Sequence, residues 1–329
     1  MKKLMVIPLV AAGMAAMVGC SKTPVKEAAK NDAINLANLD TAVAPGTDFY
    51  QYACGGWMKN NPLKPEYARF GTFDQLRDNN QEQIRTLIEG LSETPGQEGS
   101  VGQKIGMLFA MGMDSVKLNE DGYAPIKDQL AEINKLGTKD ELTKMVATLH
   151  KEGMAPFFAL YVGADEKNSS MNIVQLYQAG LGMGDRDYYL LEDESSQKMR
   201  EAYKNYITRL FTLIGSSPEQ ADAAVNAIMK IERGIAEVSF SREDLRDSQK
   251  NYNKMSIEDF KAKNDLLNWD VYFESMGMMD IKYLDAKQLS FYEGLSALMK
   301  NTTLDEQKYY LTFNLLSFAA PYLLSLIHI

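Results

Sequence analysis

The segment APFFALYVGADEKNSSMNIVQLYQ (residues 155–178) differs in pattern from the chain around it. Two short runs rich in β-branched and aromatic residues, 155–163 and 171–178, enclose the polar stretch ADEKNSS. This arrangement is typical of a β-hairpin. Most of the remaining sequence has the periodicity of amphipathic helices. The pattern therefore predicts a mainly α fold with one inserted β-hairpin.

On both sides of the hairpin, apolar residues recur with the three- and four-residue spacing of a helix face. Thr72 and Gln75 fit a capping box that starts the first helix, with Thr72 as its N-cap. Pro218 suits the first turn of a later helix. The expected helices span about 72–91, 101–113, 123–135, 139–151, 195–214, 218–240, 256–264, 286–300 and 305–320. A chain of 329 residues with this content can bury a sizeable core.

The N-terminal residues have the features of an export signal. Lys2 and Lys3 precede an apolar run that is too short to cross a bilayer, and MVGC ends the run at Cys20. The Gly-Cys ending resembles a lipobox. We therefore expect residues 1–19 to be a lipoprotein signal peptide and Cys20 to be acylated. An ordinary signal peptide with an incidental cysteine is the alternative.

The polar residues 20–44 are expected to form a flexible tether behind the acylated cysteine. The protein would then be anchored by lipid to a bacterial membrane of the cell envelope, facing the periplasm or the outer surface. Removing residues 1–19 takes away two lysines and no acid, so the net charge changes from −9 to −11. Such a chain repels nucleic acid and anionic lipid, and an acyl chain rather than a basic patch would hold it to the membrane.

Metal-ligating and nucleophilic motifs are absent from the sequence. Its two histidines, His150 and His328, are far apart, and no HExxH, CxxC or GxSxG is present. We expect His150 at a helix end, where a positive charge interacts favourably with the helix dipole. If Cys20 is acylated, Cys54 is the one thiol left, so no internal disulfide can form.

Two further segments have unusual composition. LGMGDRDYYL (181–190) lacks the spacing of a phosphate-binding loop and predicts a tight turn braced by Asp185, Arg186 and Asp187. GTDFYQYACGGW (46–57) combines four aromatic residues with the pair Gly55-Gly56, which permits close backbone approach. We interpret it as a packing motif that seals the N-terminus onto the core. An aromatic ligand cage is the alternative.

Several segments together resemble the N-terminal half of the neprilysin and endothelin-converting-enzyme family of zinc metallopeptidases. The resemblance covers roughly residues 34–323. It implies one helical lobe of a two-lobed gluzincin-type peptidase, with residues 45–323 as its N-terminal domain. The segments are DFYQYACGGWMKNNPL (48–63), RFGTFDQLRDNN (69–80), LGMGDRDYYL (181–190), IERGIAEVSFSREDLRDSQKNYNKM (231–255) and YLTFNLLSFAAPYL (310–323).

The family's zinc ligands and catalytic glutamate belong to its C-terminal half, so none can be assigned in this sequence. The resemblance implies zinc as the cofactor of the full-length protein and small peptides as its substrates. We expect this fragment alone to bind no zinc and to hydrolyse nothing. A helical lipoprotein that captures peptides or glycans for uptake, without catalysis, is the alternative.

The family's R-x-G-x-F-D-x-L-R segment assigns substrate binding to Arg69 and Arg77. In the family these arginines hold the C-terminal end of a peptide, and a guanidinium fork suits a free carboxylate. The alternative is surface pairing with Glu66, Asp74 or Asp78, which contributes about 0–1 kcal/mol per pair.

The last six residues, LSLIHI (324–329), depart from the family pattern. They match a translated transposon-end adaptor of the kind used in sequencing libraries. We therefore expect residues 324–329 to be non-native read-through, His328 to be foreign to the protein, and the gene to continue.

Overall fold

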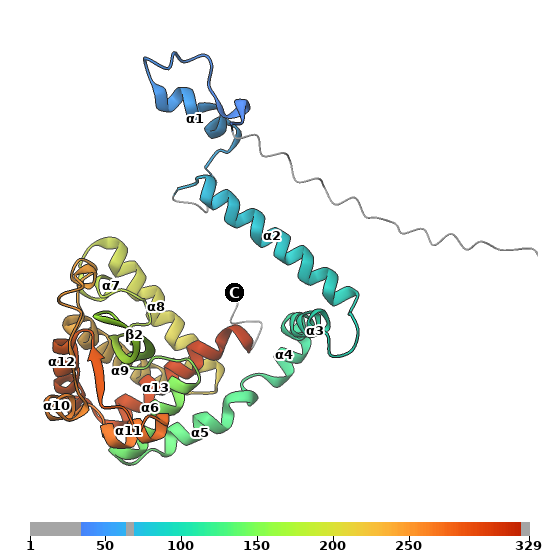
Figure 1. Cartoon of the computed structure of the whole chain (residues 1–329). Helices are drawn as coiled ribbons and strands as arrows, with labels where there is room; N and C mark the ends of the chain where they lie inside the picture. Colours follow the sequence, from blue (N-terminus) through green and yellow to red (C-terminus); the bar gives the residue numbers. More distant parts are fainter. Residues whose placement is uncertain (1–33, 64–68, 324–329) are drawn as a thin grey trace, which may run out of the picture. The chain divides into compact units, whose positions relative to one another are not determined.

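The computed structural model describes residues 34–63 and 69–323 (Figure 1). The chain forms two compact units, residues 1–87 and 88–329, and their boundary falls inside helix α2 (Thr72–Glu93). This boundary divides the stretch predicted as one domain. The predicted signal peptide, Cys20 and residues 324–329 lie outside the described residues.

In the first unit, a 3₁₀ turn η1 (Leu36–Asn38) packs against helix α1 (Phe49–Asn60), so the segment predicted as a tether is folded from Leu36 onward. The two glycines of the GGW stretch permit this contact. A Cβ atom on Gly56 would lie 2.4 Å from the carbonyl oxygen of Ala37. The GGW stretch of α1 therefore packs against the η1 turn. The buried core is formed by other residues, which run from Leu130 to Ala320.

The predicted capping box at the start of α2 is wrong in detail. Thr72 is the first helical residue, and the Asp74 carboxylate accepts the N–H of Gly71 at 2.9 Å. The amide of Gln75 instead bonds to Asn61 at 3.3 Å and accepts the indole N–H of Trp57 at 3.4 Å. An ionised carboxylate accepts a backbone N–H more strongly than a neutral side-chain amide does. This explains why Asp74, and not Gln75, binds the N–H group at the start of the helix.

The second unit is mainly helical, as predicted. Side chains of Thr138, Ser217 and Thr303 complete capping boxes at three of its helices, and Pro218 occupies the first turn of α9. Its helices are α3 (Val101–Met113), α4 (Ser115–Asp121), α5 (Lys127–Lys135), α6 (Lys139–Lys151), α7 (Asp187–Leu190), α8 (Glu194–Leu213), α9 (Pro218–Val238), α10 (Ile257–Lys263), α11 (Trp269–Met276), α12 (Leu289–Lys300) and α13 (Leu304–Ala319), with 3₁₀ turns η2 (Ala124–Ile126), η3 (Asp244–Arg246) and η4 (Ala320–Tyr322).

The predicted hairpin is present and belongs to a larger sheet. Strands β1 (Phe158–Asp165) and β2 (Asn168–Gln178) pair antiparallel, as the sequence indicated. Two short strands, β3 (Lys254–Ser256) and β4 (Tyr283–Ala286), extend the sheet in the order β1-β2-β4-β3. β4 runs parallel to β2 and antiparallel to β3.

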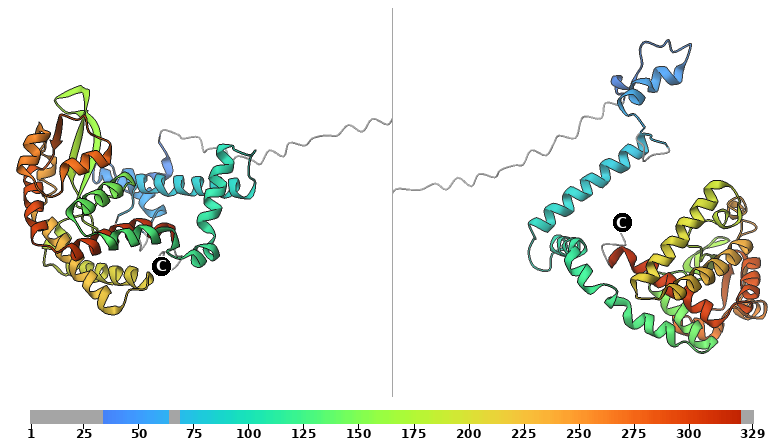
Figure 2. Two further views of the ribbon diagram at one scale, coloured as in Figure 1. Left: turned by 90° about the horizontal axis from the view of Figure 1, so that it is seen from below. Right: turned by 180° about the vertical axis from the view of Figure 1, so that it is seen from behind.

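In the second unit, seen from two further sides in Figure 2, helix α9 contacts α7, α8, α12 and α13. Its inner face is lined by small and β-branched residues such as Ala224, Ile228 and Ile231, all fully buried. The core behind the sheet is aromatic, and Phe158 contacts the rings of Trp269, Tyr272 and Tyr292. This packing fixes α9, α13 and the end of β2 relative to one another, and these elements surround the cavity described next.

Candidate functional site

A cavity of about 590 Å³ lies beside the loop that follows β2 in the second unit. The loop residues 179–182 and Gly184 form one wall of the cavity. Gln178, the last residue of β2, also lines it. Helix α9 contributes Glu232, and α13 contributes Phe313, Asn314, Ser317 and Phe318. This volume is within the range of small-ligand sites, about 300–1,000 Å³.

Glu232 is a buried carboxyl group held by two tyrosines. The hydroxyl of Tyr189 donates to its Oε2 at 2.6 Å, and the hydroxyl of Tyr203 donates to its Oε1 at 2.9 Å. Burial raises the pKa of Glu232 to about 7, although the two hydroxyls and the Gly182 backbone favour its charged form. The cavity wall thus contains a group that changes charge near neutral pH.

Tyrosine hydroxyls also fix the loop itself. Tyr310 donates to the carbonyl of Gly180 at 2.8 Å and accepts the N–H of Phe157 at 3.1 Å. Tyr189 accepts the N–H of Met183 at 3.0 Å. Gly180 has a φ of +95°, which favours glycine, and a Cβ atom on Gly182 would lie 1.8 Å from the Tyr203 hydroxyl. The glycines are therefore required for the loop to lie against the tyrosines.

The predicted turn in this segment is present, and Asp185 braces it. The Asp185 carboxylate accepts the N–H of Asp187 at 2.9 Å and forms an ion pair with Arg242. The Nε atom of Arg186 is buried and has no hydrogen-bond partner in the structure. Glu232, Tyr189 and Tyr310 were not predicted as site residues, although all three belong to the segments on which the family resemblance rests.

The two predicted substrate-binding arginines both lie in the first unit, and both are exposed. Arg77 lies 3.3 Å from Asp74 and 3.7 Å from Asp78 in α2, and its side chain is 51% exposed. Arg69 lies just before this helix, and Glu66 lies outside the described residues. Ion pairs of a half-exposed guanidinium contribute little to stability.

His150 occupies the last turn of α6, as predicted, but the predicted charge is wrong. Burial lowers its pKa to about 4, so the ring is neutral at pH 7. Its Nε2 lies 3.1 Å from the carbonyl oxygen of Pro156, and its Nδ1 lies 2.6 Å from the Tyr272 hydroxyl. A carbonyl can only accept, so Nε2 carries the proton and Nδ1 accepts from Tyr272. His150 is a structural residue of the core.

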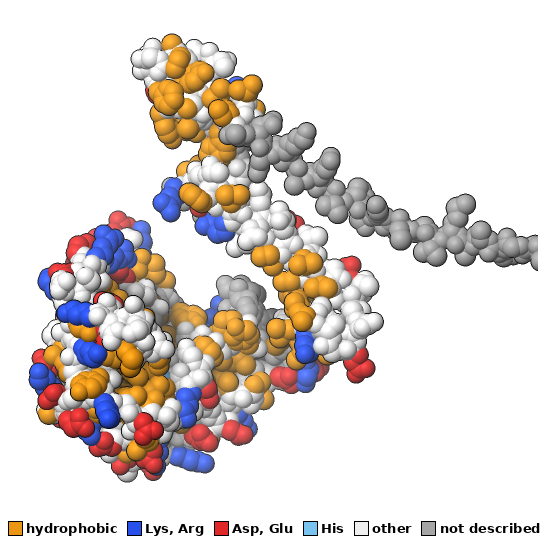
Figure 3. Space-filling view, viewed as in Figure 1, with side chains coloured by type: hydrophobic (Ala, Val, Ile, Leu, Met, Phe, Trp, Pro, Cys, Tyr) orange, Lys and Arg blue, Asp and Glu red, His pale blue; other side chains and the backbone are white. Residues whose placement is uncertain are grey.

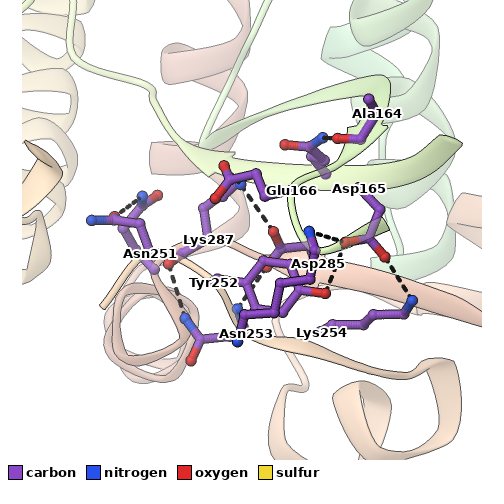
Figure 4. Close-up of polar contacts among 12 residues, drawn as sticks. Ala164, Asp165, Glu166, Asn251, Tyr252, Asn253, Lys254, Asp285 and Lys287 are labelled. Atoms are coloured by element: carbon purple, nitrogen blue, oxygen red, sulfur yellow. Dashed lines mark hydrogen bonds and ion pairs between the residues drawn. The ribbon is translucent and has the colours of Figure 1, made fainter. Parts of the chain in front are cut away.

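A second polar cluster lies at the sheet (Figure 4). Asp165 at the end of β1 accepts from Lys254 at 2.7 Å and from the Tyr252 hydroxyl at 2.8 Å. Lys254 lowers the pKa of Asp165 to about 2, with help from the Lys167 backbone and Tyr252. Each anionic group in this cluster has a cationic or hydroxyl partner, which is typical of a structural network.

Lys287, in the same cluster, is almost fully buried between Asp285, at 3.0 Å, and Glu166. Burial opposes its charge, but the two carboxylates outweigh that effect and raise its pKa. Within residues 34–63 and 69–323, no group of three or more His, Cys, Asp or Glu side chains is arranged to hold a metal ion. Over the same ranges, no helix has both the length and the apolar character needed to cross a membrane.

Comparison with known proteins identifies the family. The family model described as Peptidase family M13 matches residues 45–327. The chain belongs to peptidase family M13. It matches the N-terminal portion, and the resemblance to the neprilysin and endothelin-converting-enzyme family is thereby confirmed.

Relatives and solved structures agree with the M13 assignment. Endothelin-converting enzyme 1 of Mus musculus is 29% identical over 348 residues, which cover 98% of this chain and 44% of that protein. The enzyme of the same name from Rattus norvegicus is 31% identical, over 82% of this chain and 37% of that protein. The M13 chain thus spans less than half the length of these relatives.

Among solved structures, the Mycobacterium tuberculosis zinc metalloprotease Zmp1 in complex with an inhibitor has a TM-score of 0.78 at 24% identity, covering 90% of this chain and 45% of that one. PepO from Lactobacillus rhamnosis HN001 has a TM-score of 0.68 at 20% identity, covering 87% and 45%. These similarities confirm the mainly α lobe predicted for the M13 chain.

Proposed function

We propose that this chain is the N-terminal, substrate-enclosing portion of a zinc metalloendopeptidase that hydrolyses small peptides. The family match over residues 45–327 is the observation that supports the proposal most strongly. In the whole protein, zinc would polarise the scissile carbonyl and activate a water molecule, and a glutamate would act as general base. The described residues supply a peptide-binding wall and take no part in holding the metal.

In this proposal Arg69 and Arg77 bind the free carboxylate at the C-terminal end of the peptide. Arg77 supports this role because its side chain is 51% exposed, so its guanidinium is accessible to a ligand carboxylate. A bidentate, charge-assisted contact with a carboxylate is about twice as strong as a neutral hydrogen bond. The pair would select short peptides whose terminal carboxylate reaches it.

We also propose that acylation of Cys20 anchors the protein to a bacterial membrane, facing the periplasm or the outer surface. The lipobox-like MVGC and the polar residues after it support this. Intact-mass measurement of the mature protein would give an acyl increment on Cys20 and none on a Cys20→Ser variant. An unmodified Cys20, or a mature N-terminus elsewhere, would contradict the anchor.

The peptidase proposal is tested by sequencing the gene beyond the codon for Leu323 and expressing the whole reading frame. We expect a downstream HExxH, and hydrolysis of a quenched-fluorescence peptide that a chelator abolishes and zinc restores. Residues 20–329 alone should hydrolyse nothing. A native stop codon directly after this segment, or zinc-dependent hydrolysis by residues 20–329, would overturn the proposal.

The arginine pair is tested in the whole enzyme. Arg69→Ala and Arg77→Ala should each raise KM about tenfold or more for peptides with a free carboxylate, which corresponds to ~1.4 kcal/mol, and should leave amidated peptides unaffected. Arg233→Ala is the matched control, because its side chain is 52% exposed and pairs with Glu237 on α9. Equal effects on both kinds of peptide would contradict carboxylate binding.

A further inference from the structure

We propose that Asn168, at the tip of the β1–β2 hairpin, is the acceptor of an N-linked glycan. The modification is independent of peptide hydrolysis and requires the export of the chain to the cell envelope proposed above. The tip contains Asn168-Ser169-Ser170, an Asn-x-Ser acceptor motif without proline at its middle position. A motif this short occurs by chance, so the structure around it decides whether the asparagine can react.

The tip of the hairpin is open to solvent. Residues 166–172 are all exposed. The pairing of β1 with β2 leaves residues 169–171 without a partner in β1, and the pairing of β2 with β4 begins only at Val174. The two serines of the motif therefore lie in a stretch that makes no ladder on either side. A modifying enzyme can take up this stretch without breaking the sheet.

The side chains of the motif have the arrangement that the reaction needs. The hydroxyl of Ser170 donates to Oδ1 of Asn168 at 2.7 Å, and this contact is exposed. The amide nitrogen, Nδ2, is the atom that would form the new bond. Among the residues that the structure describes, no group forms a hydrogen bond with this nitrogen. It is therefore available as a nucleophile while the hydroxyl holds the other end of the amide.

The reaction is a group transfer in the site of an oligosaccharyltransferase. Nδ2 of Asn168 attacks the anomeric carbon of an oligosaccharide carried on a polyprenyl diphosphate. A C–N bond forms, the bond from that carbon to the diphosphate oxygen breaks, and polyprenyl diphosphate leaves. The amide loses one proton to a base of the transferase. The donor is a membrane lipid, so a chain anchored through Cys20 would lie at the same membrane.

A second motif of the same pattern, N-T-T at 301–303, provides a comparison within the chain. It lies between α12 and α13, and its reacting groups are already engaged. Nδ2 of Asn301 donates to the carbonyl of Ala297 at 3.1 Å. The Thr303 hydroxyl accepts the N–H of Glu306 at 3.2 Å as the N-cap of α13. Modification here would remove a helix cap, which destabilises the helix. We therefore expect only the hairpin motif to be modified.

The test expresses residues 1–329 in a bacterial host that contains a membrane-bound oligosaccharyltransferase and its polyprenyl-linked oligosaccharide. Intact mass and glycopeptide mapping should locate one glycan, on the peptide that contains Asn168. Asn168→Gln and Ser170→Ala should each abolish the mass shift. Ser169→Ala is the matched control, because it is an exposed change at the unconstrained middle position, and should keep the glycan. Asn301→Gln should keep it too.

The same mass spectra report export, because removal of residues 1–19 shows that the chain has left the cytoplasm. An exported chain with unmodified Asn168 would overturn the inference, and so would a chain that keeps its signal peptide. A glycan on Asn301, or one that persists in both Asn168→Gln and Ser170→Ala, would also overturn it. The hairpin variants are at exposed positions, so their urea unfolding midpoints should equal that of wild type. Failure of the peptidase proposal would appear separately, as absent hydrolysis by the whole reading frame.

Discussion

At the scale of single residues, Glu232 is the group whose environment is most unusual for its type. Its carboxyl group lies among Tyr189 of α7, Tyr203 of α8 and Tyr310 of α13, and none of the described lysine or arginine residues pairs with it. Burial therefore dominates, and the proton is retained to about pH 7.

This pKa has a consequence for stability. Between the ordinary glutamate value of 4.5 and about 7, the folded chain holds a proton that the unfolded chain has lost. The free energy of unfolding should therefore decrease as pH rises through this window, by roughly 3 kcal/mol. When the free energy of unfolding is measured with urea at pH 5 and at pH 8, the Glu232→Gln variant should lack most of this decrease. Glu237→Gln, an exposed change on the same helix, should keep it. An identical pH dependence in wild type and Glu232→Gln would contradict this account.

At the scale of elements, the polar cluster joins the two edges of the sheet. β1 and β3 are the edge strands in the order β1-β2-β4-β3, yet Asp165 of β1 bonds to Lys254 of β3. The pairing of β1 with β2 shifts register between Ala164 and Asp165, directly before the residue that bonds to Lys254. The cluster therefore connects the hairpin tip to the far side of the sheet.

Low pH should weaken the contact between Asp165 and Lys254. Asp165 has a pKa of about 2 in the folded chain against 3.8 ordinarily, so its contribution to stability is present above about pH 4 and is lost as pH falls through 2. Asp165→Asn should lower the free energy of unfolding at pH 7, and the difference from wild type should shrink toward pH 2. Asp270→Asn, which removes an exposed pair with Lys261, should change little at either pH. A pH-independent effect of Asp165→Asn would contradict an electrostatic role.

The elements also show what the sequence could predict. The hairpin and the long helices follow from side-chain periodicity, which is a local property. Helix α1 was missed because two glycines weaken its helical signal. β3 and β4 are too short for periodicity to reveal them, and they form because β4 pairs with the distant β2 and β3 pairs with β4. The cavity was missed for a similar reason, since its wall combines residues from Gly153 to Phe318.

At the scale of the whole molecule, the chain exposes an apolar face on α3. Val101, Leu108 and Met111 are 74%, 72% and 66% exposed, and hydrophobic side chains gather over this region (Figure 3). Contiguous apolar surface of this kind marks an interaction site. Under the proposed function, the remainder of the peptidase is the partner that covers it.

We therefore expect the purified chain to self-associate. Leu108→Gln combined with Met111→Gln should reduce its mean oligomer size in light scattering and its fluorescence with a hydrophobic dye. Leu191→Gln is the control, an exposed apolar residue beyond the end of α7, and should have no effect. A monodisperse wild-type monomer that binds no dye would contradict an uncovered interface.

The parallel pairing of β2 with β4 also sets an order of events during synthesis. Val174 lies beside Leu284, so the hairpin leaves the ribosome long before the strand that completes its sheet. At about 5–20 residues per second, the delay is on the order of ten seconds. Throughout that interval the edge of β2 is unpaired, and unpaired edges are where nascent chains aggregate. The hairpin is therefore the part of this protein for which a chaperone would matter most.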